Sequence, residues 1–275
     1  MRPEYKQVPE SVIDTIYARM QSFPVPNYFK CINHLDEEAI SNVVDVYAPF
    51  DANEYEKVVV FGDIHGCFNP LKEYFDANPF NENALYVFTG DYLDRGLQNK
   101  EVVEWLLQNY NRKNVALLEG NHERWLIDYA NEEYVDEIKT GIRTKCKSDE
   151  FFFNTIPQIS CFSKKDLRQL CRRFMALAYF VFDGKKYLVN HAGVGFMPEN
   201  LVKVKAMSFI RANGKYEDEV DKWFEQHELE RNPDLYQIHA HRNIANLPVV
   251  ASKNSFNLCD TVEFGGYLRI LEITK

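Results

Sequence analysis

One pattern occurs three times between residues 58 and 122: an apolar run, then a glycine, then a side chain that can bind a metal ion. The three copies are Val58–Gly66 (VVVFGDIHG), Leu85–Asp91 (LYVFTGD) and Val115–His122 (VALLEGNH). Apolar, β-branched runs that end at glycine are typical of buried parallel strands. Asp63 and Asp91 are 28 residues apart, and Asn121 follows 30 residues later. Because a βαβ unit takes roughly 30 residues or more, this spacing predicts three neighbouring parallel strands.

The polar residues that follow these three runs are expected to lie close together. The carboxyl ends of neighbouring parallel strands meet at one edge of a sheet, where open α/β sheets bind ligands. Side chains alternate along a strand, so Asp63 and His65 should point the same way. A single aspartate in a strand-to-helix turn is more often a helix cap, but the repetition favours a functional site. The candidates are Asp63, His65, Asp91, Asn121 and His122.

The histidines are concentrated at the same kind of position. Five of the seven end or follow an expected strand, namely His65, His122, His191, His239 and His241. A lone histidine there is usually structural, whereas five of them, with two aspartates and an asparagine, fit two metal ions that share a bridging carboxylate. Two-metal sites hold their ions about 3.5–4 Å apart and clamp the attacking and leaving oxygens of an in-line displacement.

Composition excludes several other classes of protein. The chain has 275 residues and no stretch that approaches the ~20 apolar residues of a membrane span. Its first residues lack the apolar core of a secretion signal. Six cysteines without a C-x-x-C pair indicate reduced thiols and a cytoplasmic location. A net charge of −9 argues against broad nucleic-acid binding, which depends on neutralising many phosphates.

We expect a main domain over residues 57–275 and an N-terminal helical flank, residues 1–56, that packs on it. The flank contains one expected helix at about 10–23, and it could equally be a partner-binding arm. A basic run at 139–147 is either a solvated loop or a lid over an anionic substrate. The remaining expected elements are helices at 164–178 (capped by Ser163) and 217–230, a hairpin at 179–189 that turns at Asp183-Gly184, and strands at 236–241, 249–251 and 267–273.

The three repeated blocks resemble a known family. Gly62–Gly66 (GDIHG), Gly90–Gly96 (GDYLDRG) and Gly120–Glu123 (GNHE) are similar to the signature blocks of calcineurin-like metallophosphoesterases of the phosphoprotein phosphatase (serine/threonine phosphatase) type, in a bacterial or phage-like form. Later segments resemble that family's other blocks: His191-Ala192-Gly193, Ser208–Arg211, Ala240-His241, and Asp260 with Phe264–Gly266. The similarity extends from about residue 57 to residue 273.

The resemblance implies a four-layer α/β/β/α sandwich of two mixed sheets and a site with two divalent metal ions. Manganese is the expected metal, with iron, zinc or nickel as alternatives. By resemblance, Asp63, His65 and Asp91 hold one ion, and Asp91, Asn121, His191 and His241 hold the other. His122 is implied as the general acid, with Asp94 orienting it, and Arg95 and Arg211 as the residues that bind the substrate phosphate. The block His239-Ala240-His241 departs from the family pattern, so a metal-binding role for His239 stays open.

The implied activity is hydrolysis of phosphomonoesters by metal-activated water, with phosphoserine and phosphothreonine in proteins as the first substrate hypothesis. The phosphorylated substrate is the expected partner. Within the same branch, the alternatives are removal of 3′-phosphate or 2′,3′-cyclic phosphate from nucleic-acid ends and hydrolysis of dinucleoside polyphosphates. A non-catalytic scaffold that binds phosphorylated partners is a further alternative. It is disfavoured because every expected ligand position is filled.

Overall fold

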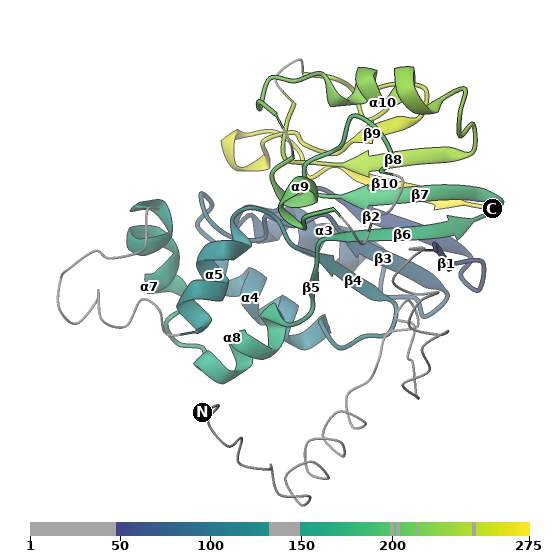
Figure 1. The fold of residues 1–275 in the computed structure, drawn as a ribbon. Helices are drawn as coiled ribbons and strands as arrows, with labels where there is room; N and C mark the ends of the chain where they lie inside the picture. The colour runs from purple at the N-terminus through teal and green to yellow at the C-terminus, as the bar shows by residue number, and fades with distance from the viewer. Residues whose placement is uncertain (1–47, 132–148, 199–200, 202–203, 213, 244–245) are drawn as a thin grey trace, which may run out of the picture.

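The computed structural model describes residues 48–131, 149–198, 201, 204–212, 214–243 and 246–275. Two five-stranded sheets form the centre of the molecule (Figure 1). The helix expected at about 10–23 and the basic run 139–147 lie outside the described residues. In the part of the chain that is described, no helix is both long enough and apolar enough to cross a membrane.

The first sheet contains the three predicted parallel strands. Its order is β10 (Ile270–Thr274), β2 (Lys57–Phe61), β3 (Ala84–Phe88), β4 (Val115–Leu118) and β5 (Phe174–Met175). Strands β2 to β5 are parallel and β10 is antiparallel to β2. The prediction of parallel pairing is therefore confirmed, and the three apolar runs end at one edge of this sheet.

The second sheet has the order β1 (Phe50–Asp51), β6 (Leu177–Phe182), β7 (Lys185–Asn190), β8 (Leu235–His239) and β9 (Ser255–Asn257). Strands β6 and β7 form the predicted antiparallel hairpin, which turns at Asp183-Gly184, and the other pairs are parallel. Both sheets are thus mixed, as expected.

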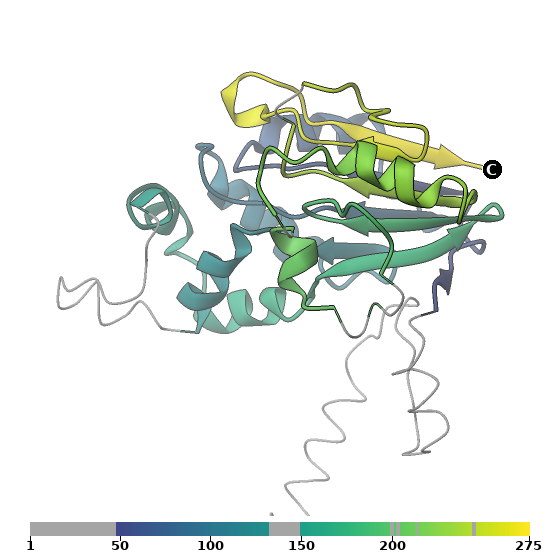
Figure 2. The same cartoon turned by 45° about the horizontal axis from the view of Figure 1, so that its top comes forward.

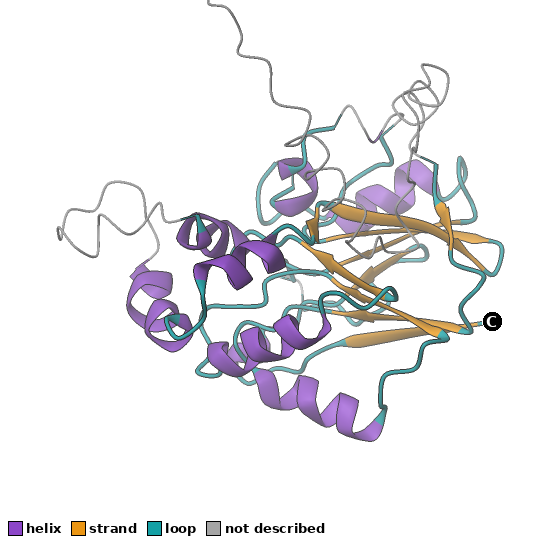
Figure 3. Ribbon diagram, turned by 90° about the horizontal axis from the view of Figure 1, so that it is seen from below, coloured by secondary structure: helices purple, strands orange, loops and turns teal. Residues whose placement is uncertain are grey.

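Helices cover the outer face of each sheet (Figure 2). The first sheet carries α3 (Phe68–Ala77), α4 (Asn99–Asn109), α5 (Glu123–Ala130) and α8 (Lys164–Cys171), and α7 (Ile156–Ile159) packs against α4 beside them. The second sheet carries α9 (Met207–Ile210) and α10 (Val220–Glu228). Figure 3 shows the resulting layers of helix, sheet, sheet and helix. The predicted four-layer sandwich is confirmed.

Alternation along the central strands explains why the sheets are covered on both faces. On β2, Val59 and Phe61 pack toward the helices, whereas Val58 and Val60 pack between the two sheets. The Phe61 ring stacks on Phe88 with the centroids 4.5 Å apart. Burying a Val or Phe side chain contributes roughly 1.5–3 kcal/mol, so a strand that is apolar on both faces is stable only at the centre of such a sandwich.

Several predicted boundaries were wrong. The helix that begins after Ser163 ends at Cys171 instead of Ala178, because Phe174–Met175 pairs with β4 as a fifth strand and Leu177 begins β6. Ser163 does cap the helix: its Oγ accepts from the backbone N–H of Asp166 at 3.1 Å. The strand expected at 249–251 is reduced to a single bridge between Val250 and Phe256.

Candidate metal centre and active site

The candidate site lies where β2, β3 and β4 end, and its backbone is unusually strained. Nine residues other than glycine have positive φ angles in the described chain, and five of them belong to the site: His65 (44°), Asp91 (49°), Asp94 (74°), Arg95 (68°) and His241 (66°). Strained backbone of this kind concentrates at functional sites, where the surrounding structure holds it in place. Here the backbone N–H groups of both Ile64 and His65 donate to the carbonyl of Asp91, at 3.1 and 2.8 Å.

Asp91 is the centre of the site. It is 2% exposed and belongs to both groups of side chains in the described residues that could hold a metal ion. One group is Asp91 with His65 and His122, and the other is Asp91 with His191 and His241. Asp91 Oδ2 lies 3.5 Å from His65 Nε2 and 3.2 Å from His191 Nε2. A carboxylate shared by two groups of ligands is the arrangement that a bridged pair of metal ions requires.

Two histidines present a ring nitrogen to this centre because their other nitrogen is held elsewhere. His65 Nδ1 lies 3.1 Å from the carbonyl oxygen of Leu93, and His191 Nδ1 lies 3.0 Å from that of Thr89. A carbonyl only accepts, so Nδ1 carries a proton in both residues, and Nε2 is the nitrogen that would face a cation held at Asp91. Such backbone contacts fix the tautomer of metal-ligating histidines.

Asp63 provides the test of whether these residues fit a metal ion. The Oδ2 atom of Asp63 accepts from the backbone N–H of His241 at 3.0 Å. Its Oδ1 atom is buried and has no hydrogen-bond partner among the described residues. Burial, together with the negative charge of Asp91, raises the pKa of Asp63 to about 7. A buried carboxylate oxygen that forms no hydrogen bond, with His191 Nδ1 at 3.6 Å, fits a cation as an additional partner.

Asn121 also reaches this cluster. Its Oδ1 lies 3.1 Å from His191 Nε2, the nitrogen that faces Asp91. Asn121 follows β4, so the third repeated block contributes a ligand candidate, as the sequence predicts. The structure thus brings together Asp63, His65, Asp91, Asn121, His191 and His241.

His122 forms a tight pair with Asp94. His122 Nδ1 lies 2.6 Å from Asp94 Oδ2, and Asp94 is fully buried. The other carboxylate oxygen, Oδ1, accepts from the Thr155 hydroxyl, and the Asp94 backbone N–H donates to Asn99 Oδ1. Burial alone would lower the pKa of His122, but the hydrogen bond to Asp94 outweighs it, so this pKa is raised above its usual value. His122 is therefore held as a proton-carrying imidazole beside the metal-ligand candidates.

The two arginines expected to bind phosphate differ in position. Arg95 lies inside the site: its Nη1 is 3.2 Å from His65 Nε2, and its Nη2 is 3.4 Å from His122 Nε2. The same Nη1 donates to Glu263 Oε1 at 2.5 Å. Arg211, by contrast, is an exposed residue at the end of α9. Among the described residues, it is not part of the cavity lined by Asp63, His65, Asp91, Arg95, Tyr216, His241, Cys259, Thr261 and Glu263.

His239, left open by the sequence, has a different set of contacts. It is fully buried, its Nε2 lies 2.9 Å from Asp221 Oδ1, and its Nδ1 lies 2.9 Å from the carbonyl oxygen of Ala240. Both ring nitrogens are therefore engaged away from Asp91. Strand β8 ends at His239, and the left-handed turn at His241 directs that second histidine toward Asp91 and His191.

Sequence reasoning missed the role of Glu123. Its carboxylate is fully buried and accepts three backbone N–H groups, from Asp91, Tyr92 and Gly120, at 2.7, 2.9 and 2.7 Å. Burial and the negative charge of Asp91 raise its pKa to about 8, although the three donors oppose the rise. Glu123 thus joins the ends of β3 and β4. Its position at the end of the third block was the available signal.

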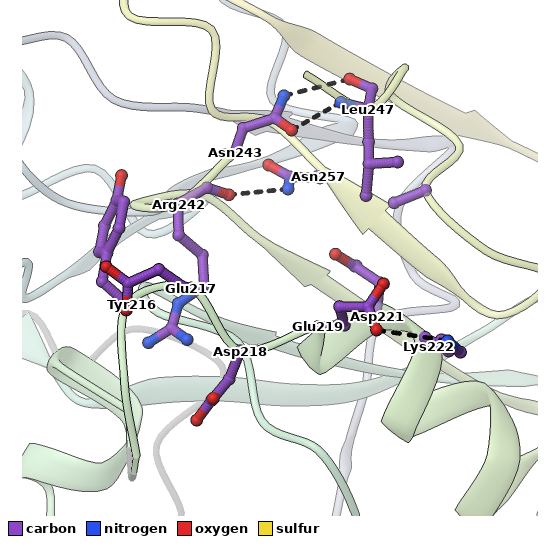
Figure 4. Close-up of a pocket in the computed structure, with 11 residues that line it drawn as sticks. Tyr216, Glu217, Asp218, Glu219, Asp221, Lys222, Arg242, Asn243, Leu247 and Asn257 are labelled. Carbon is purple, nitrogen blue, oxygen red and sulfur yellow. Dashed lines mark hydrogen bonds and ion pairs between the residues drawn. The ribbon is translucent and has the colours of Figure 1, made fainter. Parts of the chain in front are cut away.

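A second cleft adjoins the metal cavity (Figure 4). Tyr216 lines both, and its hydroxyl donates to the carbonyl oxygen of His241 at 2.8 Å. The wall of this cleft carries more acidic than basic residues: Glu217, Asp218, Glu219 and Asp221 against Lys222 and Arg242. The part of a substrate that extends out of the metal cavity past Tyr216 would therefore meet a negatively charged surface.

Fold and site together define a phosphoesterase of the two-metal class, and comparison with known proteins gives the family. Residues 56–262 match the model of the calcineurin-like phosphoesterase family. The chain therefore belongs to this family, whose members are dinuclear metal-dependent enzymes. This confirms the predicted family and agrees with the predicted class of enzyme, a phosphoester hydrolase.

Curated relatives and solved structures agree with this placement. The chain is 30% identical over 145 residues to serine/threonine-protein phosphatase T of Aspergillus oryzae, which covers 50% of this chain and 25% of that protein. It is 32% identical over 111 residues (39% of this chain, 23% of the relative) to a proposed serine/threonine-protein phosphatase of Caenorhabditis elegans. The chain spans about a quarter of the length of these relatives. A solved structure of a proposed diadenosine tetraphosphatase superposes with a TM-score of 0.54 at 18% identity, covering 82% of this chain and 91% of that one, which shows a shared fold.

Proposed function

We propose that this protein is a metal-dependent phosphatase that hydrolyses phosphomonoesters, with phosphoserine and phosphothreonine in proteins as its substrates. The observation that carries the proposal is the placement of the His122–Asp94 pair, 2.6 Å apart, beside two groups of metal-ligand candidates that share Asp91. An acid next to a two-metal site is what hydrolysis of an ester with a poor leaving group requires.

We assign the metal ligands as follows: Asp63, His65 and Asp91 for one ion, and Asp91, Asn121, His191 and His241 for the other. The Oδ1 atom of Asp63, which is buried and forms no hydrogen bond in the described residues, and the Nε2 atoms that face Asp91 support this assignment. Manganese is our proposed metal, since oxygen and imidazole ligands suit it. When bound, two such cations lower the pKa of water and neutralise the charge that develops on the phosphoryl group.

The protein's own groups perform the remaining chemistry. His122 donates the proton that the leaving alkoxide needs, and Asp94 keeps its imidazole cationic and oriented through Nδ1. Arg95 provides N–H donors for the phosphoryl oxygens at the mouth of the cavity. Arg211 lies outside this cavity, so we propose that it contacts the phosphoryl group only if the α9 segment moves toward the metals.

The cleft beside Tyr216 favours a protein substrate over the alternatives. Its acidic wall repels the several phosphates of a nucleic-acid end or a dinucleoside polyphosphate, whereas a phosphopeptide brings one phosphate and basic or neutral neighbours. The names of the two relatives point in the same direction.

A substrate panel tests this proposal. The protein with and without Mn²⁺ is given a phosphoserine peptide, a 3′-phosphate oligonucleotide, a 2′,3′-cyclic phosphate and a dinucleoside tetraphosphate, and phosphate release is measured. We expect Mn²⁺-dependent turnover with the highest kcat/KM on the peptide. A higher kcat/KM on an oligonucleotide or a dinucleotide would replace the protein-phosphatase assignment.

We further propose a cytoplasmic location and a single catalytic domain over residues 57–275, to which Phe50–Asp51 adds the edge strand β1, with the rest of the predicted flank 1–56 preceding it. The support for the location is that the four cysteines in the described residues, Cys67, Cys161, Cys171 and Cys259, are free thiols. The domain assignment is supported by the family match over residues 56–262.

A further inference from the structure

Glu263 places a carboxylate in the metal cavity without belonging to either group of metal-ligand candidates. It lies in a short 3₁₀ turn, Val262–Phe264, and its side chain is 1% exposed. Nothing in the sequence pattern marked this residue. A buried carboxylate next to a site for an anionic substrate is unfavourable for binding, so its presence calls for an explanation.

The turn that carries Glu263 is held firmly in place. Thr261 and Gly265, on either side of it, both have left-handed φ angles, 46° and 94°. Asp260 anchors the segment by accepting from Arg269 Nη2 at 3.0 Å and from the backbone N–H of Tyr267 at 3.2 Å. A side chain at Gly266 would come within 1.6 Å of the Asp260 carbonyl oxygen, so the turn depends on glycine there. The position of Glu263 is therefore fixed by the fold.

The contacts of Glu263 are directed at Arg95. Its Oε1 accepts from Arg95 Nη1 at 2.5 Å, whereas its Oε2 is buried and has no hydrogen-bond partner among the described residues. Arg95 Nη1 and Nη2 are also the donors that lie nearest to His65 and His122, where the phosphoryl group of a substrate would bind. Glu263 and a phosphoryl oxygen thus require the same guanidinium donor.

We propose that Glu263 competes with the substrate phosphoryl group for Arg95 and so sets the affinity of the site for phosphate. This inference builds on the proposed phosphatase function. Glu263 occupies a strong, charge-assisted donor in the absence of substrate, so an anion must displace it to gain the full interaction with Arg95. The competition weakens the binding of free phosphate, the product, as well as the binding of substrate. It raises KM and reduces product inhibition.

The test measures phosphate binding directly, by isothermal titration calorimetry of inorganic phosphate into the Mn²⁺-loaded protein. Glu263→Gln preserves the shape of the side chain but removes its charge, and we expect phosphate to bind about tenfold more tightly, as expected for regaining one hydrogen bond between charged groups. KM for the phosphopeptide should fall in parallel. The matched control is Glu104→Gln, which removes one exposed carboxylate from α4 and should leave phosphate affinity unchanged.

Two further variants separate competition from other roles. Glu263→Asp retains the charge but withdraws it from Arg95, so it should also tighten phosphate binding, whereas simple repulsion by the charge predicts little change. In an Arg95→Ala background, Glu263→Gln should no longer improve affinity, because the donor under competition is gone. A melting temperature for each variant verifies that the turn has folded.

Weaker phosphate binding in Glu263→Gln would overturn the proposal and make Glu263 a positioning residue for Arg95. An improvement that persists without Arg95 would overturn it in favour of direct repulsion. Because the measurement is binding of phosphate, its result is independent of the substrate panel. Failure of the protein-phosphatase assignment would therefore be seen in the panel, while failure of the competition would be seen in the titration.

Discussion

Asp94→Asn tests how the site controls its proton donor. Asp94 is fully buried and accepts from His122 Nδ1 at 2.6 Å, which makes this a short, charge-assisted hydrogen bond. Such bonds contribute about 1.5–3 kcal/mol, and about 1.4 kcal/mol corresponds to one pKa unit. Asparagine retains the shape but not the charge. The pKa of His122, which the Asp94 bond raises against the effect of burial, should therefore fall by roughly one to two units.

The direction of the pH effect follows from the role of His122. A general acid is active only when protonated, so activity is lost as pH rises through its pKa. In the wild type, the raised pKa extends activity toward alkaline pH. Asp94→Asn should move the alkaline limb of the pH profile to lower pH by about one to two units, as the size of the charge-assisted bond requires.

The assay is the pH dependence of kcat/KM for two phosphate esters with different leaving groups. A phosphoserine peptide needs a proton on its leaving oxygen, whereas p-nitrophenyl phosphate does not. The alkaline limb of the pH profile should therefore shift for the peptide and change little for the aryl ester. A matched control is Thr155→Val, which removes a donor to the other oxygen of Asp94 but keeps the charge. If the alkaline limb of the pH profile is unchanged in Asp94→Asn with both substrates, the assignment of His122 as the general acid is refuted.

Three other substitutions distinguish the roles of the histidines. The His122→Ala variant should keep its metal content. Its rate of phosphoserine hydrolysis should fall about 100- to 10,000-fold, the usual range for general acid catalysis, and its rate on aryl phosphates should fall less. Loss of metal instead would make His122 a ligand, as its proximity to His65 and Asp91 allows. His241→Ala should lose bound metal, measured by elemental analysis. His239→Ala should keep metal but melt at lower temperature, because it leaves buried Asp221 without its 2.9 Å partner, a loss of about 1–3 kcal/mol. Equal loss of metal in the last two variants would contradict the positions of these histidines, His239 at the end of β8 and His241 in the turn after it.

The sequence predicted the parallel sheet and its polar edge because both depend on local patterns. Apolar runs such as Val58–Phe61 identify strands, and the regular spacing of Asp63, Asp91 and Asn121 identifies neighbouring units. The left-handed φ angles at Asp91 and His241 were not predictable. They arise from tertiary contacts, such as the bond from the His241 N–H to Asp63, that join segments 178 residues apart.

Contacts between distant segments also explain what the sequence did not show. Thr155 and Glu263 enter the site from two short helical turns, Phe151–Thr155 and Val262–Phe264, that carry no metal-ligand spacing. The helix predicted over 164–178 was too long because Phe174 and Met175 have strand partners that only the folded sheet provides. The resemblance placed Arg211 at the substrate phosphate. In the structure Arg211 is exposed at the end of α9, and its position is set by how that helix packs on the second sheet.

The most direct test of the two-metal account is Asp91→Asn. Asp91 is the residue shared by both groups of ligand candidates, and its negative charge would hold two cations close together. Burial alone would raise the pKa of Asp91, but the imidazole of His191 outweighs it, so this carboxylate stays ionised at neutral pH. Metal content and phosphomonoester turnover are measured on the same Mn²⁺-equilibrated sample. The account predicts two ions per chain in the wild type, and fewer ions with almost no turnover in Asp91→Asn. Two ions and near-wild-type turnover in the variant would contradict it.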